Sequence, residues 1–108
     1  MHALLQAGAD VDKSRDDGAT PLYMASQEGH VPVVQALLQG GADVDKARDG
    51  GGTPLFMASQ QGHLPVVQAL LQDGADVEKA RDGGGTPLMA ARQQGHAAVV
   101  RCLKTFTK

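Results

Sequence analysis

Short amphipathic stretches alternate along the chain with polar, glycine-rich stretches. Valine and leucine recur at positions i, i+1, i+4 and i+5 in residues 33–38 and again in residues 66–71, which gives a broad apolar face on a helix. Glutamines fall on the opposite face of both stretches, so that face is expected to be exposed. The pattern predicts one helix that begins near Pro32 and another that begins near Pro65.

A second kind of helix is predicted just before each of these, and Thr-Pro marks its start. A threonine hydroxyl can accept a hydrogen bond from an unpaired N–H group of the first turn, and proline suits the first helical position. Thr20, Thr53 and Thr86 are each followed by proline. In the first unit Gly29 is expected to end the helix, because glycine readily adopts the left-handed conformation of a helix terminus. Helices of about eight residues are marginal alone, so packing must stabilise them.

The predicted helix pairs recur with a period of 33 residues. Thr-Pro-Leu at residue 20 returns at 53 and 86, Gly-His at 29 returns at 62 and 95, and Gly-Ala-Asp-Val at 8 returns at 41 and 74. Between the helix pairs, residues 43–52 and 76–85 are rich in Asp, Lys, Arg and Gly. We expect each of these segments to project as a turn-like finger in which only Val44 and Val77 are buried. Such a period indicates an array of one repeated unit.

These motifs resemble those of the ankyrin repeat family. The resemblance rests on the T-P-L-x-x-A, G-H and G-A-D-V motifs and extends from residue 3 to about residue 103. It implies an all-α fold, an ankyrin-repeat solenoid of three helix pairs with projecting loop fingers and a leading half-repeat. We divide the chain into a partial N-terminal repeat over residues 1–19 (the end of a second helix and its finger), repeats over residues 20–52 and 53–85, and a C-terminal capping repeat over residues 86–108.

Two sets of positions depart from the family pattern. The family usually has histidine at the position after Thr-Pro-Leu, where this chain has Tyr23, Phe56 and Met89. The hydrogen bonds that the resemblance implies for that histidine therefore cannot form. In each finger an arginine replaces an aspartate that is common in the family. The sequence therefore does not decide whether the usual Asp-centred turn contacts form.

The two ends of the array differ from its middle. Residues 3–6 correspond to the back of a second helix that has no first helix before it. Leaving Leu4 and Leu5 uncovered costs about 1.5–3 kcal/mol for each side chain, so we expect this end to be cut, swapped or covered. A homodimer joined through Leu4 and Leu5 is one such arrangement. Lys104 and Arg101 replace Leu and Gln of the other units, which suits a polar capping face at the end of an array.

Composition and charge argue against several classes of protein, among them nucleic-acid-binding and membrane proteins. Apolar residues make up 42% of the chain and charged residues 20%, and the formal net charge is -2 with the two signs interleaved. This distribution predicts neither nucleic-acid nor membrane binding. With no stretch of about 20 apolar residues, the chain is expected to be a cytoplasmic protein, with the nucleus as an alternative intracellular location. Cys102 is the only cysteine and is expected to be a small buried residue rather than a disulfide partner or zinc ligand.

The recurring histidines raise the possibility of a metal site. His30, His63 and His96 repeat with the period of the array, but ligands must converge within about 2.0–2.3 Å of one ion. Stacked units separate equivalent side chains by much more. We predict instead that each histidine hydrogen-bonds backbone near the start of its second helix or in the adjoining finger, and we predict no metal and no cofactor.

Other patterns that could carry chemistry have simpler explanations. Carboxylate pairs in the fingers are flanked by Lys and Arg, as in exposed salt bridges worth about 0–1 kcal/mol each. The glycine-rich finger tips lead into Thr-Pro rather than into the Lys-Ser/Thr of a phosphate-binding loop. Ser26 and Ser59 each precede a histidine by four residues, but a glycine separates the two and the third unit has Arg92 instead of serine. We therefore predict that the chain is not an enzyme.

The predicted function is a non-catalytic protein–protein interaction module whose protein partner is of unknown identity. The resemblance implies that partner contacts lie on the concave surface, which the finger tips and first helices form. The candidate contacts are Asp16, Asp17, Tyr23, Gln27, Glu28, Asp49, Phe56, Gln60, Gln61, Asp82, Met89, Arg92, Gln93 and Gln94. The three residues after Thr-Pro-Leu could be apolar anchors or could be buried between helices and fingers. The alternative function is a structural scaffold or self-assembling repeat unit with no specific partner.

Overall fold

The computed structural model describes residues 18–47, 52–81 and 83–106. Within these ranges the regular structure is entirely helical, which confirms the predicted all-α class. The helices are α2 (Pro21–Glu28), α3 (Val31–Gln39), α4 (Pro54–Gln61), α5 (Leu64–Gln72), α6 (Pro87–Gln93) and α7 (Ala97–Phe106).

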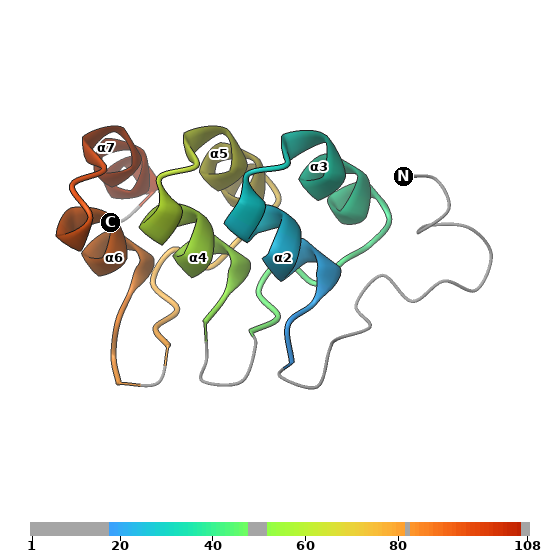
Figure 1. Cartoon of the computed structure of the whole chain (residues 1–108), viewed down its shortest axis with the longest axis horizontal. Coiled ribbons are helices and arrows are strands. Elements are labelled where there is room, and N and C mark those ends of the chain that lie inside the picture. Colours follow the sequence, from blue (N-terminus) through green and yellow to red (C-terminus); the bar gives the residue numbers. More distant parts are fainter. Residues whose placement is uncertain (1–17, 48–51, 82, 107–108) are drawn as a thin grey trace.

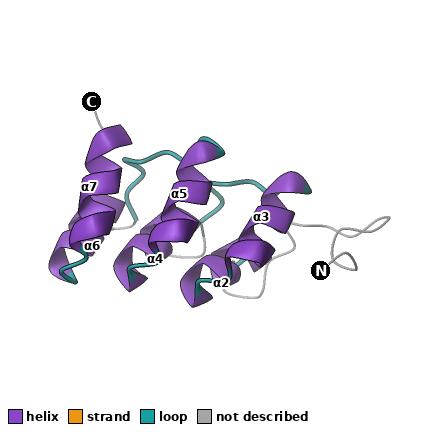
Figure 2. Ribbon diagram, turned by 90° about the horizontal axis from the view of Figure 1, so that it is seen from above, coloured by secondary structure: helices purple, strands orange, loops and turns teal. Residues whose placement is uncertain are grey.

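The helices stack in two rows. The first helices of the pairs, α2, α4 and α6, lie side by side, and the second helices, α3, α5 and α7, form a row behind them (Figure 1, Figure 2). Each helix contacts its partner in the pair and its counterparts in the neighbouring pairs. The connecting fingers extend from the same edge of the stack (Figure 1). This arrangement is the helix-pair solenoid that the sequence predicted.

Local capping positions the first helices. The hydroxyls of Thr20, Thr53 and Thr86 accept hydrogen bonds from the backbone N–H three residues later at 3.1, 3.1 and 3.2 Å. A proline follows each threonine at the start of the helix. Gly29 and Gly62 end α2 and α4 in the left-handed conformation with φ +77°. The predicted threonine caps and the predicted end of α2 at Gly29 are therefore confirmed, whereas the residue that ends α6, Gln94, has a right-handed backbone conformation.

The core lies between the two rows. Leu22 and Leu55 from the first helices and Leu37 and Leu70 from the second helices have no exposed surface. On the outer side of the second helices the glutamines are exposed, as predicted: Gln35, Gln39, Gln68 and Gln72. The amphipathic pattern therefore identified both faces of these helices correctly.

The fingers differ from the sequence prediction in what they bury. Val44 and Val77 are only partly buried, whereas Ala42 is 7% exposed. The N–H of Ala42 donates to the carbonyl of Leu37 at 3.0 Å, which holds this residue against the end of α3. Ala42 lies just before the finger segment of residues 43–52. Within the described part of the fingers the two valines are not fully buried, and Asp45 and Ala47 are partly buried as well, so the expectation that the valines alone are buried is wrong.

Aspartates shape the finger backbone. Asp43 Oδ1 accepts from the N–H of Asp45 at 3.1 Å, and Asp76 Oδ1 accepts from the N–H of Glu78 at 3.0 Å. The two carboxylate oxygens of Asp45 accept from the N–H of Asp76 in the next finger at 3.0 and 3.2 Å. Asp-centred turn contacts therefore form at Asp43 and Asp76, which are not the positions where arginine replaces the aspartate of the family, and the carboxylate of Asp45 joins neighbouring fingers.

The described residues test the prediction for the C-terminal end of the array but not the one for its N-terminal end. Arg101 and Lys104 are exposed on α7, as a polar capping face requires. Cys102 is partly buried rather than fully buried, because it lies beside the exposed side of α7. Leu4 and Leu5 lie outside the described residues, so the homodimer through them stays a prediction.

Candidate functional site

The candidate contacts gather at the ends of the first helices. Gln27 and Glu28 end α2, Gln60 and Gln61 end α4, and Gln93 ends α6 with Gln94 directly after it. These three helix ends lie in a row across the stack (Figure 1). We call these six residues, together with Met89 and Arg92, the first-helix surface. The candidates Asp16, Asp17, Asp49 and Asp82 lie outside the described residues.

Within this surface, exposure alternates at the ends of α2 and α4, whereas Gln93 and Gln94 at the end of α6 are both exposed. Glu28, Gln61 and Gln94 are exposed, whereas Gln27 and Gln60 are partly buried. The partly buried residues lie at the junction with the following repeat. An exposed amide presents a donor and an acceptor to a partner, and an exposed carboxylate presents an acceptor with a charge.

Histidines fasten each repeat to the one before it. His63 Nε2 donates to the carbonyl of Gln27 at 2.9 Å, and His96 Nε2 donates to the carbonyl of Gln60 at 3.0 Å. The acceptor is in the preceding repeat, so the prediction of a bond near the start of the same second helix or in its finger is wrong. Within the described residues no group of three His, Cys, Asp or Glu side chains could hold a metal ion.

Each of these histidine rings lies beside a glycine, and the space that a side chain would fill at that glycine is occupied by the ring. A Cβ atom added to Gly29 would lie 2.8 Å from His63 Nδ1, and one added to Gly62 would lie 2.6 Å from His96 Nδ1. Real Cβ atoms do not come that close to other heavy atoms. Gly29 and Gly62 therefore have two roles: each ends a first helix, and each leaves space for the histidine ring of the next repeat.

The three residues after Thr-Pro-Leu separate into two groups. Tyr23 is 2% exposed and Phe56 is 5% exposed, so both lie in the interior, which was one of the two alternatives for these side chains. The Arg81 guanidinium lies over the Phe56 ring, 5.2 Å from its centroid. Met89 is 48% exposed and remains available as an apolar contact. Burial thus removes the two aromatic candidates from the surface on which they were expected.

The third repeat brings a charge to this surface. Ser26 and Ser59 are fully buried, and their hydroxyls have no hydrogen-bond partner. Arg92 occupies the corresponding position in α6 and is exposed. Buried hydroxyls of this kind offer no accessible nucleophile, so the pairing of serine with histidine has no catalytic geometry.

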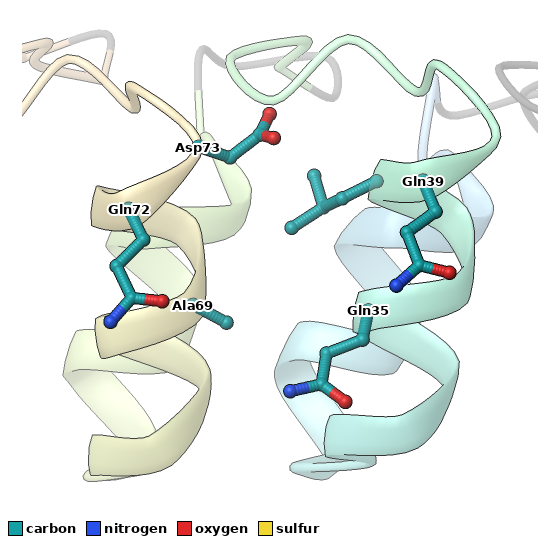
Figure 3. A pocket seen from close by; sticks show the side chains of 6 residues that line it. Gln35, Gln39, Ala69, Gln72 and Asp73 are labelled. Carbon is teal, nitrogen blue, oxygen red and sulfur yellow. The ribbon is translucent and has the colours of Figure 1, made fainter.

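A groove between the second helices was not predicted from the sequence. Gln35, Leu38 and Gln39 of α3 face α5, and Asp73 at the end of α5 extends toward α3 (Figure 3). With Ala69 and Gln72, these residues line a space of about 310 Å³. The sequence indicated that the glutamines are exposed, but a groove requires two such faces at a fixed separation, which only the packing of α3 on α5 supplies.

The described helices give no indication of a membrane-spanning segment. None of them has both the length and the apolar character needed to cross a bilayer.

Comparison with known proteins supports the repeat architecture. The profile of a family described as ankyrin repeats (3 copies) matches residues 1–81 of the 108-residue chain. A comparison with curated proteins finds no match. Ankyrin repeats are generally protein–protein interaction modules and are typically non-catalytic. Because the match covers most of the chain and the structure repeats one helix pair through the same histidine contacts, the chain belongs to the ankyrin repeat family.

Proposed function

We propose that the chain is a non-catalytic interaction module that binds a protein partner on its first-helix surface and the adjoining fingers. The observation that carries this proposal is the row of exposed polar side chains at equivalent positions of successive repeats, Glu28, Gln61 and Gln94. Equivalent positions in a stack of repeats are evenly spaced. An extended segment of a partner can therefore contact all three at once.

Rigid spacing supports the same proposal. The histidine bonds of 2.9 and 3.0 Å between repeats hold the helix ends in place before a partner arrives. A preorganised surface lowers the entropy cost of binding. The amides then select a partner by hydrogen bonding, and Met89 offers an apolar contact at one end.

The charge of this surface favours one orientation of the partner. Glu28 lies at the α2 end and Arg92 at the α6 end. A partner segment with a basic residue toward α2 and an acidic residue toward α6 would be electrostatically complementary. The proposal also places the chain in the cytoplasm, supported by the single cysteine, which is free.

The experiment is affinity capture from cell lysate with two matched triple variants. The first carries Glu28→Ala, Gln61→Ala and Gln94→Ala. The second carries Gln35→Ala, Gln39→Ala and Gln72→Ala in the groove between the second helices. All six side chains are exposed, so both variants should keep the circular dichroism spectrum of the wild type.

The expected result is a set of proteins captured by the wild type and the groove variant but not by the first-helix variant. Capture that survives the first-helix changes and disappears with the groove changes would contradict the proposal, because the partner would then bind the second helices. Equal capture by all three chains would contradict it as well.

A further inference from the structure

The groove between α3 and α5 lies beside two negative helix ends. The two helices are neighbours in the stack and run in the same direction, so that Gln39 and Gln72, their last residues, lie at the same end of the groove (Figure 3). The C-terminus of a helix carries a partial negative charge, and a cation in the last turn is stabilising. Neither α3 nor α5 has a basic residue in its last turn. The helices themselves therefore leave this negative potential unbalanced.

Asp73 adds a full negative charge to the same end of the groove. It follows α5 directly, its N–H donates to the carbonyls of Ala69 and Leu70 at 3.2 and 3.1 Å, and its side chain extends toward α3 (Figure 3). The residue is exposed, and its carboxylate makes no hydrogen bond or ion pair with the described residues. A carboxylate at a helix C-terminus is electrostatically unfavourable, so the stability of α5 does not account for it.

The equivalent positions of the other repeats show that the helix end does not require this carboxylate. Gly40 ends α3 with φ −81°, and Asp73 ends α5 with the closely similar φ −85°. The second helix of the third repeat, α7, has the opposite charge, Lys104, in its last turn. Among the described second helices, the additional negative charge is therefore specific to the groove between α3 and α5.

Hydrogen-bond acceptors and apolar surface line the remainder of the groove. Gln35, Gln39 and Gln72 are exposed, and each amide oxygen can accept hydrogen bonds. Leu38 and Ala69 are partly buried and contribute apolar surface. None of the described residues that line the groove is basic. The space of about 310 Å³ is at the lower end of the roughly 300–1,000 Å³ found for ligand sites, which suits one long side chain.

We propose that this groove binds an arginine side chain of a partner protein. The methylene groups of the arginine pack against Leu38 and Ala69, and its guanidinium donates to the Asp73 carboxylate and to the amide oxygens of Gln39 and Gln72. The groove belongs to the second helices, so the proposal does not depend on the interaction function of the first-helix surface.

Other charged ligands fit the groove less well. A calcium ion requires six to eight oxygen ligands, and Asp73 is the single carboxylate among the described residues that line the groove. An acidic or phosphorylated segment would meet a like charge. The ammonium group of lysine is compact and strongly hydrated, whereas the planar guanidinium has five donors that can bond a carboxylate and neighbouring amide oxygens together.

NMR titration of the 15N-labelled chain with three blocked tripeptides tests this specificity. The peptides are acetyl-Gly-Arg-Gly-amide and the same peptide with citrulline or with lysine in place of arginine. Citrulline nearly matches the shape of arginine but carries no charge. The arginine peptide should cause saturable shifts of the Ala69 backbone N–H and of the Gln39 and Gln72 side-chain amides. The citrulline peptide should bind at least about tenfold more weakly, and the lysine peptide should also bind more weakly than the arginine peptide.

Two variants separate the Asp73 carboxylate from other exposed carboxylates. Asp73→Asn keeps the shape of the side chain and should weaken binding of the arginine peptide by at least about tenfold. Glu28→Gln is the matched control, because Glu28 is an exposed carboxylate at the end of α2, and it should leave binding unchanged. Each variant removes an unfavourable charge from a helix C-terminus. Urea unfolding should therefore show both to be at least as stable as the wild type, so that weaker binding cannot result from a damaged fold.

The capture experiment with the first-helix variants remains independent of this contact. Its groove variant retains Asp73, and a single arginine in an open groove is held too weakly to retain a protein from lysate.

Several results of the titration would overturn the proposal. They are the absence of saturable shifts with the arginine peptide, equal affinity for the arginine and citrulline peptides, and equal affinity of the wild type and Asp73→Asn. Equal affinity for the lysine peptide would overturn the assignment to arginine. Shifts that Glu28→Gln abolishes would place the cation at α2 and would overturn the proposal as well.

Discussion

Replacing Gly62 with alanine should cost more stability than the same change at Gly95. Gly62 has φ +77° and Gly95 has φ +74°, so the backbone penalty is the same at both sites, about 1–2 kcal/mol for an L-residue in the left-handed region. The surroundings differ. The new Cβ would lie 2.6 Å from His96 Nδ1 at Gly62 and would meet nothing within 4 Å at Gly95.

The difference between the two variants measures the contact between repeats. In Gly62→Ala the His96 ring must move away from the new methyl group, and this breaks its 3.0 Å bond to the carbonyl of Gln60. A hydrogen bond of this kind contributes about 0.5–1.5 kcal/mol. We therefore expect a loss of about 1.5–3.5 kcal/mol for Gly62→Ala against about 1–2 kcal/mol for Gly95→Ala, a large share of the roughly 5–15 kcal/mol typical of a domain.

Urea unfolding followed by far-UV circular dichroism measures both losses at a protein concentration where the chain is monomeric. His96→Ala supplies the control, because the ring and the new methyl group compete for one space. In the Gly62→Ala background, His96→Ala should cost close to nothing, whereas alone it should cost about 1 kcal/mol. Equal losses for the two glycine variants would refute the assignment of this ring to the interface between repeats.

Three further predictions concern single side chains. Thr53→Ala should lower the free energy of unfolding by about 1–2 kcal/mol, because the Thr53 hydroxyl accepts from the N–H of Phe56 at 3.1 Å in a fully buried site; Thr86→Ala, at a partly buried site, should cost less in the same urea titration. Ser59→Ala should raise the free energy of unfolding by about 1 kcal/mol, since the Ser59 hydroxyl is buried without a partner; a destabilised variant would reveal a hydrogen bond in solution. Burial raises the pKa of the Cys102 thiol. The pH at which alkylation of Cys102 reaches half its maximal rate should thus be higher in the folded chain than in urea. The stability that the neutral thiol contributes should be fully present below the pKa of Cys102 in the unfolded chain. It should be lost as the pH rises through the pKa of Cys102 in the folded chain.

The candidate site was predictable only in part, and the reason is visible in particular residues. Glu28, Gln61 and Gln94 are exposed at the ends of first helices, which the polar pattern and the helix length indicated. Tyr23 and Phe56 are buried although their register could equally have made them surface anchors. Whether an apolar side chain in a short helix is buried depends on what packs over it, and that neighbour comes from another repeat.

The sequence by itself determined the local structure of this chain. Thr20 and Thr53 cap helices, and Gly29 and Gly62 end them, because the interacting groups lie within a few residues of one another along the backbone. The spacing of valine and leucine likewise determined which side of each second helix is buried. Such features need no knowledge of how the repeats stack.

Tertiary structure decided how one repeat holds the next. His63 bonds a carbonyl 36 residues earlier in the chain, and Asp45 accepts from a backbone N–H 31 residues later. No local rule selects these partners, since each depends on the distance and rotation between neighbouring helix pairs. The close packing of α2 with α4 and of α4 with α6 sets both.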